Sequence, residues 1–172
     1  MLEINQTYWL DIHECELVRF VANQRQSNKE ATGLDGKGTV NERSSVDLNS
    51  AGFGAEYLFC KQMNLMPDFS VGNTSKIKGT DLYDAQWNGM TVDVKVSRKH
   101  NNPMMIPTYS KSDVKIFAFF VGDLPTYTFK GFATNAMVFD DRNIRMTRVE
   151  SYVLKTTKML SLEELNFLIN DL

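Results

Sequence analysis

The chain has 172 residues, of which 42% are hydrophobic and 23% are charged, and its formal net charge is -2. This composition excludes a disordered or fibrous protein, and folding at this length buries roughly two thirds of the unfolded chain's surface. The longest apolar run, residues 116–121, is far shorter than the roughly 20 residues of a membrane helix, and the start of the chain lacks a signal-peptide pattern. We therefore expect one intracellular domain over residues 1–172 with no membrane partner.

The net charge argues against a protein that coats nucleic acid through bulk positive charge. The charge nevertheless changes sign along the chain. Residues 1–93 carry 8 Lys and Arg against 13 Asp and Glu, whereas residues 94–158 carry 11 against 5. The second segment predicts modest, salt-sensitive binding of a polyanion on one side of the domain.

Two helices are predicted in the first part of the chain. Residues 11–24 place their apolar side chains on one face, and Asp11 with Glu14 has the spacing of a capping box. Residues 47–64 form the second helix, which Pro67 ends. Between them, residues 27–45 combine three glycines with polar side chains, which predicts a mobile loop.

The hydrophobic pattern then changes to the period of a β-strand. Residues 80–87 and 90–97 are two extended runs joined by Asn88-Gly89, the strongest short signal of a hairpin turn. A mixed α/β (α+β) domain is the fold class that this order of elements predicts. The remaining predicted elements are a β pair at 115–121 and 126–134, a short strand at 151–154, an edge strand or partner-packing wedge at 103–107, and a closing helix at 162–169 capped by Ser161 and Glu164.

The predicted strand 90–97 carries an acid and an amine on one face. Asp93 and Lys95 alternate with Val92, Val94 and Val96, which take the other face. A carboxylate can hold Mg²⁺ through hard oxygen ligands, while a neighbouring ammonium positions the attacking water and offsets charge on a phosphate. An isolated Asp-x-Lys is more often the solvent face of an amphipathic strand, so further acids are needed to indicate a site.

Glu56 on the predicted helix 47–64 supplies a further acid. Its neighbours on the same face are all apolar or small: Gly52, Phe53, Phe59, Cys60 and Met63. A carboxylate on such a face costs several kcal/mol unless it is paired, protonated or bound to a metal, so a partner cation is expected. The alternative is that Glu56 lies at the edge of the stripe and reaches solvent.

This combination resembles the PD-(D/E)XK nuclease superfamily, and it is most similar in appearance to small phage-encoded members. The resemblance spans residues 47–134 and implies a restriction-endonuclease-like core, in which a central mixed β-sheet is flanked by helices. Thr80 stands where the motif has a proline. The residues that carry the resemblance are Glu56 within Gly54-Ala55-Glu56-Tyr57-Leu58, Asp81 within Gly79-Thr80-Asp81-Leu82, and Asp93-Val94-Lys95.

The resemblance also implies roles for these residues. Asp81 and Asp93 would bind a metal ion together with the Val94 carbonyl. Lys95 would position the water, and Glu56 would act as a ligand or through bound water. The implied cofactor is Mg²⁺, for which Mn²⁺ would substitute.

The expected activity is that of a metal-dependent deoxyribonuclease that hydrolyses phosphodiester bonds in DNA. Arg98, Lys99 and Lys111 would then form a basic rim for the nucleic acid, although lysines near strand ends are also ordinary surface residues. A homodimer would let so small a chain cut both strands of a duplex. The alternative is a catalytically inactive nuclease-fold protein that binds DNA or serves as an accessory factor. If the chain is phage-encoded, either protein would work in the cytoplasm of the host cell.

The hairpin turn raises a question about the first metal ligand. A two-residue turn at Asn88-Gly89 places Asp84 opposite Asp93, and it directs Asp81 towards the valine face. Either a β-bulge in residues 82–87 re-aims Asp81, or Asp84 is the partner acid. The resemblance favours Asp81, with Asp84 as the reserve acid.

Overall fold

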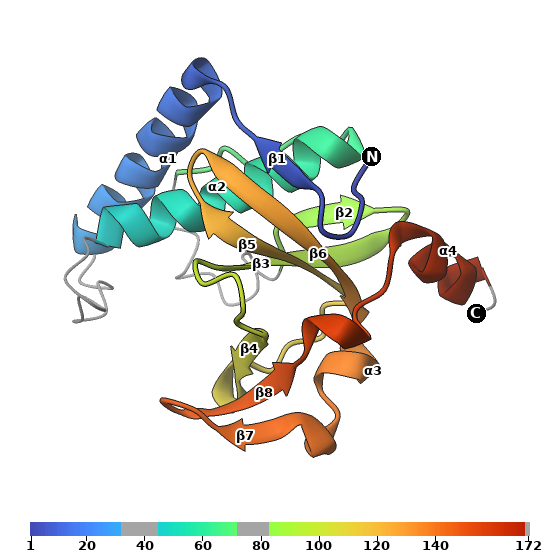
Figure 1. Cartoon of the computed structure of the whole chain (residues 1–172). Helices are drawn as coiled ribbons and strands as arrows, with labels where there is room; N and C mark the ends of the chain where they lie inside the picture. The colour runs from blue at the N-terminus through green and yellow to red at the C-terminus, as the bar shows by residue number, and fades with distance from the viewer. Residues whose placement is uncertain (32–44, 72–82, 171–172) are drawn as a thin grey trace.

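The computed structural model describes residues 1–31, 45–71 and 83–170. The chain forms a mixed α/β fold in which helices flank a curled mixed sheet (Figure 1). Short 3-10 turns, η2 at Thr108–Ser110, η3 at Asp141–Asn143 and η4 at Thr156–Lys158, join some of the elements. The helices and strands, in chain order, are β1 Thr7–Trp9, α1 Ile12–Ala31, α2 Ser45–Met63, β2 Ala85–Trp87, β3 Met90–Ser97, β4 Met104–Pro107, β5 Ile116–Asp123, β6 Thr126–Thr134, α3 Asn135–Val138, β7 Ile144–Met146, β8 Glu150–Leu154 and α4 Leu162–Asn170.

The main sheet has the strand order β1-β6-β5-β3-β2. Strands β3 and β5 run parallel, and the other neighbours are antiparallel. Parallel neighbours need a crossover, which residues 98–115 supply. This crossover contains β4, the edge strand of a second, three-stranded sheet in the order β4-β8-β7. The edge-strand interpretation of residues 103–107 is therefore confirmed.

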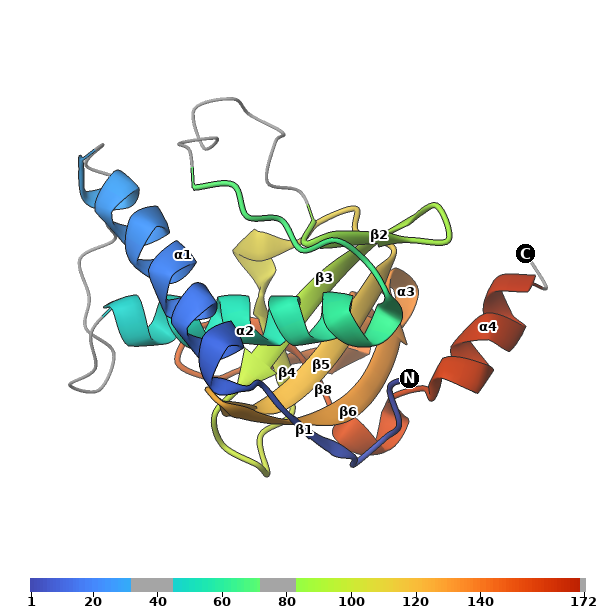
Figure 2. The ribbon, with the colours of Figure 1, turned by 90° about the horizontal axis from the view of Figure 1, so that it is seen from above.

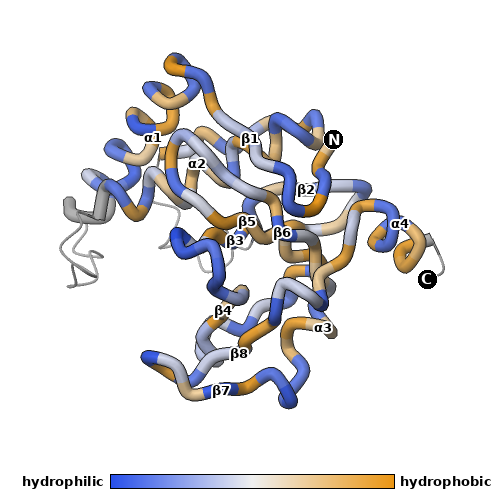
Figure 3. Tube along the Cα trace, viewed as in Figure 1, coloured by the Kyte–Doolittle hydropathy of each residue, from blue (hydrophilic) through white to orange (hydrophobic). Residues whose placement is uncertain are grey.

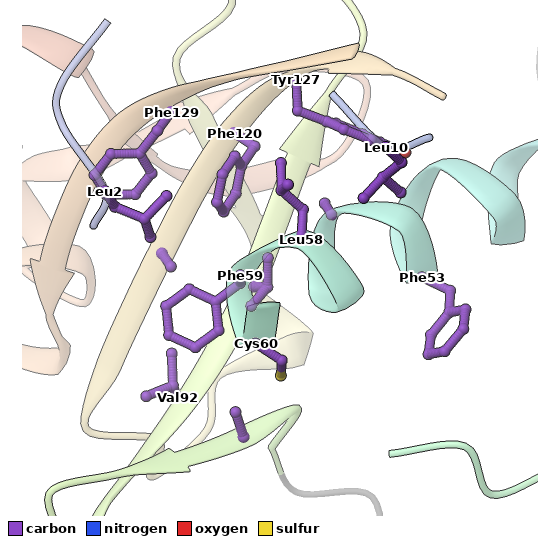
Figure 4. Close-up of a cluster of buried hydrophobic side chains, with 14 of the residues drawn as sticks. Leu2, Leu10, Phe53, Leu58, Phe59, Cys60, Val92, Phe120, Tyr127 and Phe129 are labelled. Carbon is purple, nitrogen blue, oxygen red and sulfur yellow. The ribbon is translucent and has the colours of Figure 1, made fainter. Parts of the chain in front are cut away.

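The two faces of the main sheet carry separate hydrophobic clusters. On one face α2 packs through Leu58 and Phe59 against Val92 of β3 and Phe120 of β5 (Figure 4). On the other face, Phe117 and its neighbours on β5 join buried residues of the second sheet. Strand β5 reaches both clusters because its side chains alternate between the faces, and every residue from Ile116 to Gly122 is buried. Helices α1 and α2 thus cover one face, and the second sheet covers the other (Figures 1 and 2).

The two predicted capping boxes, before α1 and before α4, are confirmed by their hydrogen bonds. At the start of α1, the Asp11 N–H donates to Glu14 Oε2 at 2.9 Å, and the Glu14 N–H donates to Asp11 Oδ1 at 2.9 Å. Ser161 and Glu164 form the corresponding pair of bonds before α4. Bands of hydrophobic and hydrophilic residues follow one another along α1, as expected for a helix with one buried face (Figure 3).

The predicted loop at 27–45 is wrong at both ends. Residues 27–31 continue α1, and residue 45 already belongs to α2. The physical reason is that a polar stretch without glycine, such as residues 27–31, extends a helix whose buried face has already fixed its position. Residues 32–44, with the three glycines, lie outside the described part of the chain.

Gly54 allows α2 to pack close to strand β6 of the sheet. A Cβ at this position would overlap the hydroxyl of the buried Tyr127 on β6, and that hydroxyl donates a hydrogen bond to the Ala51 carbonyl at 3.1 Å. A residue without a side chain is therefore required where α2 and β6 approach. Glu56 lies two residues further along α2, so this contact also helps to position the candidate site.

Candidate active site

The acid and the amine of β3 form a close ion pair. Lys95 Nζ lies 2.6 Å from Asp93 Oδ1, and the exposed fractions of the two side chains are 37% and 17%. Val92 and Val94 are buried in the cluster beneath α2. The predicted alternation along this strand is confirmed, because the charged pair occupies the opposite face, beside Phe117 and Phe119 of β5 in the strand register.

The cation that pairs with Glu56 is Arg25 of α1. Arg25 Nη1 lies 3.4 Å from Glu56 Oε2, and the two side chains are 25% and 23% exposed. The same guanidinium donates to the Ser70 and Asp68 carbonyls, at 3.1 and 2.7 Å, and its Cζ lies 4.5 Å from the centre of the Phe53 ring. Arg25 therefore ties Glu56 to the segment that follows α2. The expected partner exists, although the sequence pattern did not identify it as Arg25.

Asp84 lies beside β3, directly before the edge strand β2. The hairpin has the predicted register, with Trp87 opposite Met90, and Asn88 and Gly89 both have positive φ, as a two-residue turn of this kind requires. The Asp84 N–H donates to the Val92 carbonyl at 2.9 Å, and Asp84 Oδ2 accepts the Val94 N–H at 2.6 Å. Because backbone N–H groups point along the plane of a sheet, this second bond places the carboxylate at the sheet edge, between the two faces.

The predicted strand over residues 80–87 is only partly confirmed. Strand β2 begins at Ala85, and residues 83 and 84 are not part of it. The carboxylate of Asp84 replaces the strand's next backbone partner, which ends the regular ladder. Asp81 lies outside the described residues, so its role as the first metal ligand stays a prediction.

The carboxylates of this cluster influence one another. Burial raises the pKa of Asp84 to about 8, and the charges of Glu56 and Asp93 add to the rise, against the opposing effects of the Val94 N–H and Lys95. Burial also raises the pKa of Glu56, although the Arg25 guanidinium opposes this change. Asp84 at the sheet edge thus interacts electrostatically with Glu56 of α2 and with the Asp93 and Lys95 pair of β3.

These donors fit a hard divalent cation in type. Mg²⁺ prefers carboxylate oxygens, and it is commonly held by one or two of them together with water and substrate phosphate. The charge of Asp93 raises the pKa of both Asp84 and Glu56, and a bound cation would relieve this repulsion. Within the described ranges, no three acidic, histidine or cysteine side chains converge into a ready-made metal cage.

The three predicted rim residues lie in different surroundings. Arg98 Nε is 2.9 Å from Asp123 Oδ2, and Arg98 Nη2 donates to the Asp47 carbonyl at 2.6 Å, so this side chain joins α2 to the end of β5. Lys99 is exposed. Lys111 Nζ lies 5.7 Å from the centre of the Phe139 ring, beside the second sheet. The described contacts do not bring these three residues together into one rim.

Comparisons of the chain with models of protein families, with curated proteins and with solved structures found no match. Among the helices of the described segments, none is long and apolar enough to cross a membrane. The function therefore has to be inferred from the chemistry of the site itself.

Proposed function

We propose that the chain is a Mg²⁺-dependent nuclease that hydrolyses the phosphodiester bonds of DNA. We propose further that it has the restriction-endonuclease-like core of the PD-(D/E)XK superfamily. One observation carries the proposal: Lys95 and Asp93 lie 2.6 Å apart on β3, and Asp84 and Glu56 lie within the electrostatic reach of this pair. A lysine beside several carboxylates is the arrangement needed to combine metal binding with orientation of water.

The proposed metal ligands are Asp93, Asp84 and the motif residue Asp81, together with the Val94 carbonyl. Glu56 would contribute through bound water. The bound ion would act as a Lewis acid towards the phosphate, and Mn²⁺ would substitute for Mg²⁺.

The protein's own side chains have separate tasks in this proposal. Lys95 holds its ammonium protons next to Asp93, where they can orient a water molecule for attack and offset charge that develops on the phosphate. Arg25 opposes the rise in the pKa of Glu56, so it favours the ionised form of this carboxylate. Arg25 is thus a positioning residue, because its contacts are with Glu56 and the backbone rather than with the proposed reacting atoms.

The proposal is tested by incubating the purified chain with linear, circular, single-stranded and branched DNA. Each substrate is incubated with Mg²⁺, with Mn²⁺ or with a chelator. We expect cleavage of at least one substrate with either metal, and none with the chelator. If neither metal supports cleavage of any DNA or RNA substrate, the proposal is wrong.

A second candidate is a nuclease-fold protein without catalysis that binds DNA or acts as an accessory factor. The observation in its favour is that Lys95 already pairs with Asp93 and the Val94 N–H already pairs with Asp84. Calorimetric titration with Mn²⁺ separates the two candidates. Heat of binding that disappears in Asp93→Asn supports the enzyme, whereas the inactive protein should bind no divalent ion at this residue.

A further inference from the structure

A concave basic surface lies on the far side of the main sheet from α2. A hollow of about 430 Å³ is lined by residues of the segment η3–β7 and of the segment β8–η4. Strands β7 and β8 lie in the lower part of Figure 1. Four of its lining side chains are cationic and one is acidic: Arg142, Arg145, Lys155 and Lys158, with Asp140. We call these five residues the basic hollow.

Asp140, the single acid of the basic hollow, is hydrogen-bonded to Arg142. Arg142 Nε lies 3.0 Å from both carboxylate oxygens of Asp140, and Arg142 Nη2 lies 2.5 Å from Oδ2. These hydrogen bonds lower the pKa of Asp140 to about 2. The charge of Lys158 also lowers the pKa of Asp140, but four cations against one acid still leave the hollow with an excess of positive charge at neutral pH.

The backbone that carries these cations is well anchored. The buried Asn143 donates its side-chain amide to the Met137 carbonyl at 2.7 Å, which fixes η3 against α3. Arg145 Nη1 donates to the Arg142 and Ile144 carbonyls, at 2.8 and 2.6 Å, so this guanidinium is held in place before any ligand arrives. A pre-organised cation loses less conformational entropy when it binds an anion.

The two lysines of the basic hollow are exposed and lie on one short turn. The Lys158 N–H donates to the Lys155 carbonyl at 3.0 Å across η4, so the two side chains start from neighbouring points of the backbone. Cations that line a concave surface concentrate their positive electrostatic potential inside it, where an anion would bind. Arginine and lysine together are the usual ligands of phosphate groups.

We propose that the basic hollow binds the phosphate backbone of a nucleic acid at a place separate from the carboxylate site. The choice of nucleic acid rests on the proposed function, because a nuclease substrate supplies a row of phosphates that can extend from one site to the other. The narrow phosphate backbone of a nucleic acid can enter a concave surface such as the basic hollow. A lipid membrane presents a flat surface, which fits a concave site less well. The contacts would be independent of sequence, since phosphates carry no base information.

The test is DNA binding by fluorescence anisotropy in the presence of a chelator, so that no cleavage occurs. The affinity is measured from about 50 to about 200 mM salt for the full chain and for the double variant Lys155→Ala/Lys158→Ala. Loss of two phosphate contacts should reduce the slope of log affinity against log salt by roughly 1.8, because each contact contributes about 0.9. The affinity ratio between the two proteins should then change about tenfold across this salt range.

The matched control is Lys61→Ala/Lys130→Ala, which removes the same charge from α2 and β6. Lys61 pairs with Glu14 and Lys130 with Asn5, and neither lysine lines the basic hollow. This control should keep the slope of the unmodified chain. Thermal unfolding of each variant checks that the fold is retained.

An unchanged slope in Lys155→Ala/Lys158→Ala overturns the inference, and so does an equal effect in the control. A loss of binding to phosphatidylserine vesicles with unchanged DNA binding also overturns it, in favour of a lipid surface. Failure of the nuclease proposal gives a different result. A chain that never cuts DNA, but loses DNA binding when the two lysines are removed, contradicts the proposed function and supports the basic hollow.

Discussion

Asp84 is an acid of the candidate site with a strongly raised pKa. Its pKa is raised to about 8 from the ordinary value of 3.8 for an aspartate, chiefly by burial. A carboxyl with a raised pKa binds more protons in the folded state than in the unfolded state. Its contribution to the free energy of unfolding is therefore present at pH below about 4 and is lost as the pH rises through about 8.

We predict that Asp84→Asn reduces the fall in stability between pH 5 and pH 8. Asparagine keeps an oxygen that accepts the Val94 N–H but carries no charge, so in a chelator the variant should be more stable than the unmodified chain at about pH 8, by on the order of 2 kcal/mol. Urea unfolding at both pH values measures the difference. Equal pH dependence of the two proteins would show that Asp84 has an ordinary pKa.

Arg25 and Glu56 give a second prediction at the scale of single residues. Arg25→Gln leaves a half-buried carboxylate without its cation, and we expect a loss of about 1–3 kcal/mol in the free energy of unfolding. The double variant with Glu56→Gln should recover part of this loss. Lys61→Ala removes a cation that is 42% exposed from Glu14, which still accepts the Asp11 N–H, and it should cost less than about 1 kcal/mol. Similar losses from both pairs would contradict the buried role of Arg25.

Helix α2 owes its position to the close approach at Gly54, and this gives a prediction at the scale of elements. Gly54→Ala should destabilise the fold by about 1–3 kcal/mol, because the new methyl group would overlap the Tyr127 hydroxyl. Gly52 offers a matched control on the same helix, since a Cβ there would meet no atom within 4 Å. Gly52→Ala should stabilise the helix by up to about 1 kcal/mol, and opposite signs in thermal unfolding of the two variants would confirm the contact.

The elements that the sequence predicts best are those with a strong local signal. Strand β3 and strand β6 begin and end at the predicted residues, 90–97 and 126–134, because alternation and turn residues mark both boundaries. Both helix capping boxes also form as predicted. In contrast, β1 and β7 have three residues each, which is too short for an alternating pattern to stand out.

The candidate site was predictable only in part. The Asp93 and Lys95 pair follows from alternation within one strand, and the need of Glu56 for a cation follows from its apolar neighbours. Arg25 was missed because it pairs across 31 positions of sequence, and such contacts leave no periodic signal. The register of the hairpin did place Asp84 opposite Asp93, but the turn of its carboxylate into the sheet edge depends on where β2 ends.

At the scale of the whole molecule, the two charged regions lie on different parts of the fold. The carboxylate cluster lies at the β2 edge of the main sheet, with Glu56 on the side of α2 and Asp93 on the side of the second sheet, and the basic hollow lies on the second sheet. This arrangement would allow a nucleic acid to be held by one region while the other acts on it.

Binding of a divalent ion should stabilise the entire domain. An ion that binds only the folded state adds roughly 3 kcal/mol to the free energy of unfolding when its concentration is about 100 times its dissociation constant. We therefore predict that Mg²⁺ raises the melting temperature of the unmodified chain and has little effect on Asp93→Asn. An equal rise in both proteins would place the binding of the ion elsewhere.

The central claim is that Lys95 and the neighbouring acids form a hydrolytic site, and the rate of DNA cleavage in Mg²⁺ by Lys95→Ala tests it most directly. The control is Lys130→Ala, a lysine on β6 that hydrogen bonds to Asn5. We predict that Lys95→Ala cuts at least about 100-fold more slowly than the unmodified chain while it still folds and binds DNA, and that Lys130→Ala cuts normally. Cleavage by Lys95→Ala at the rate of the unmodified chain would contradict the claim.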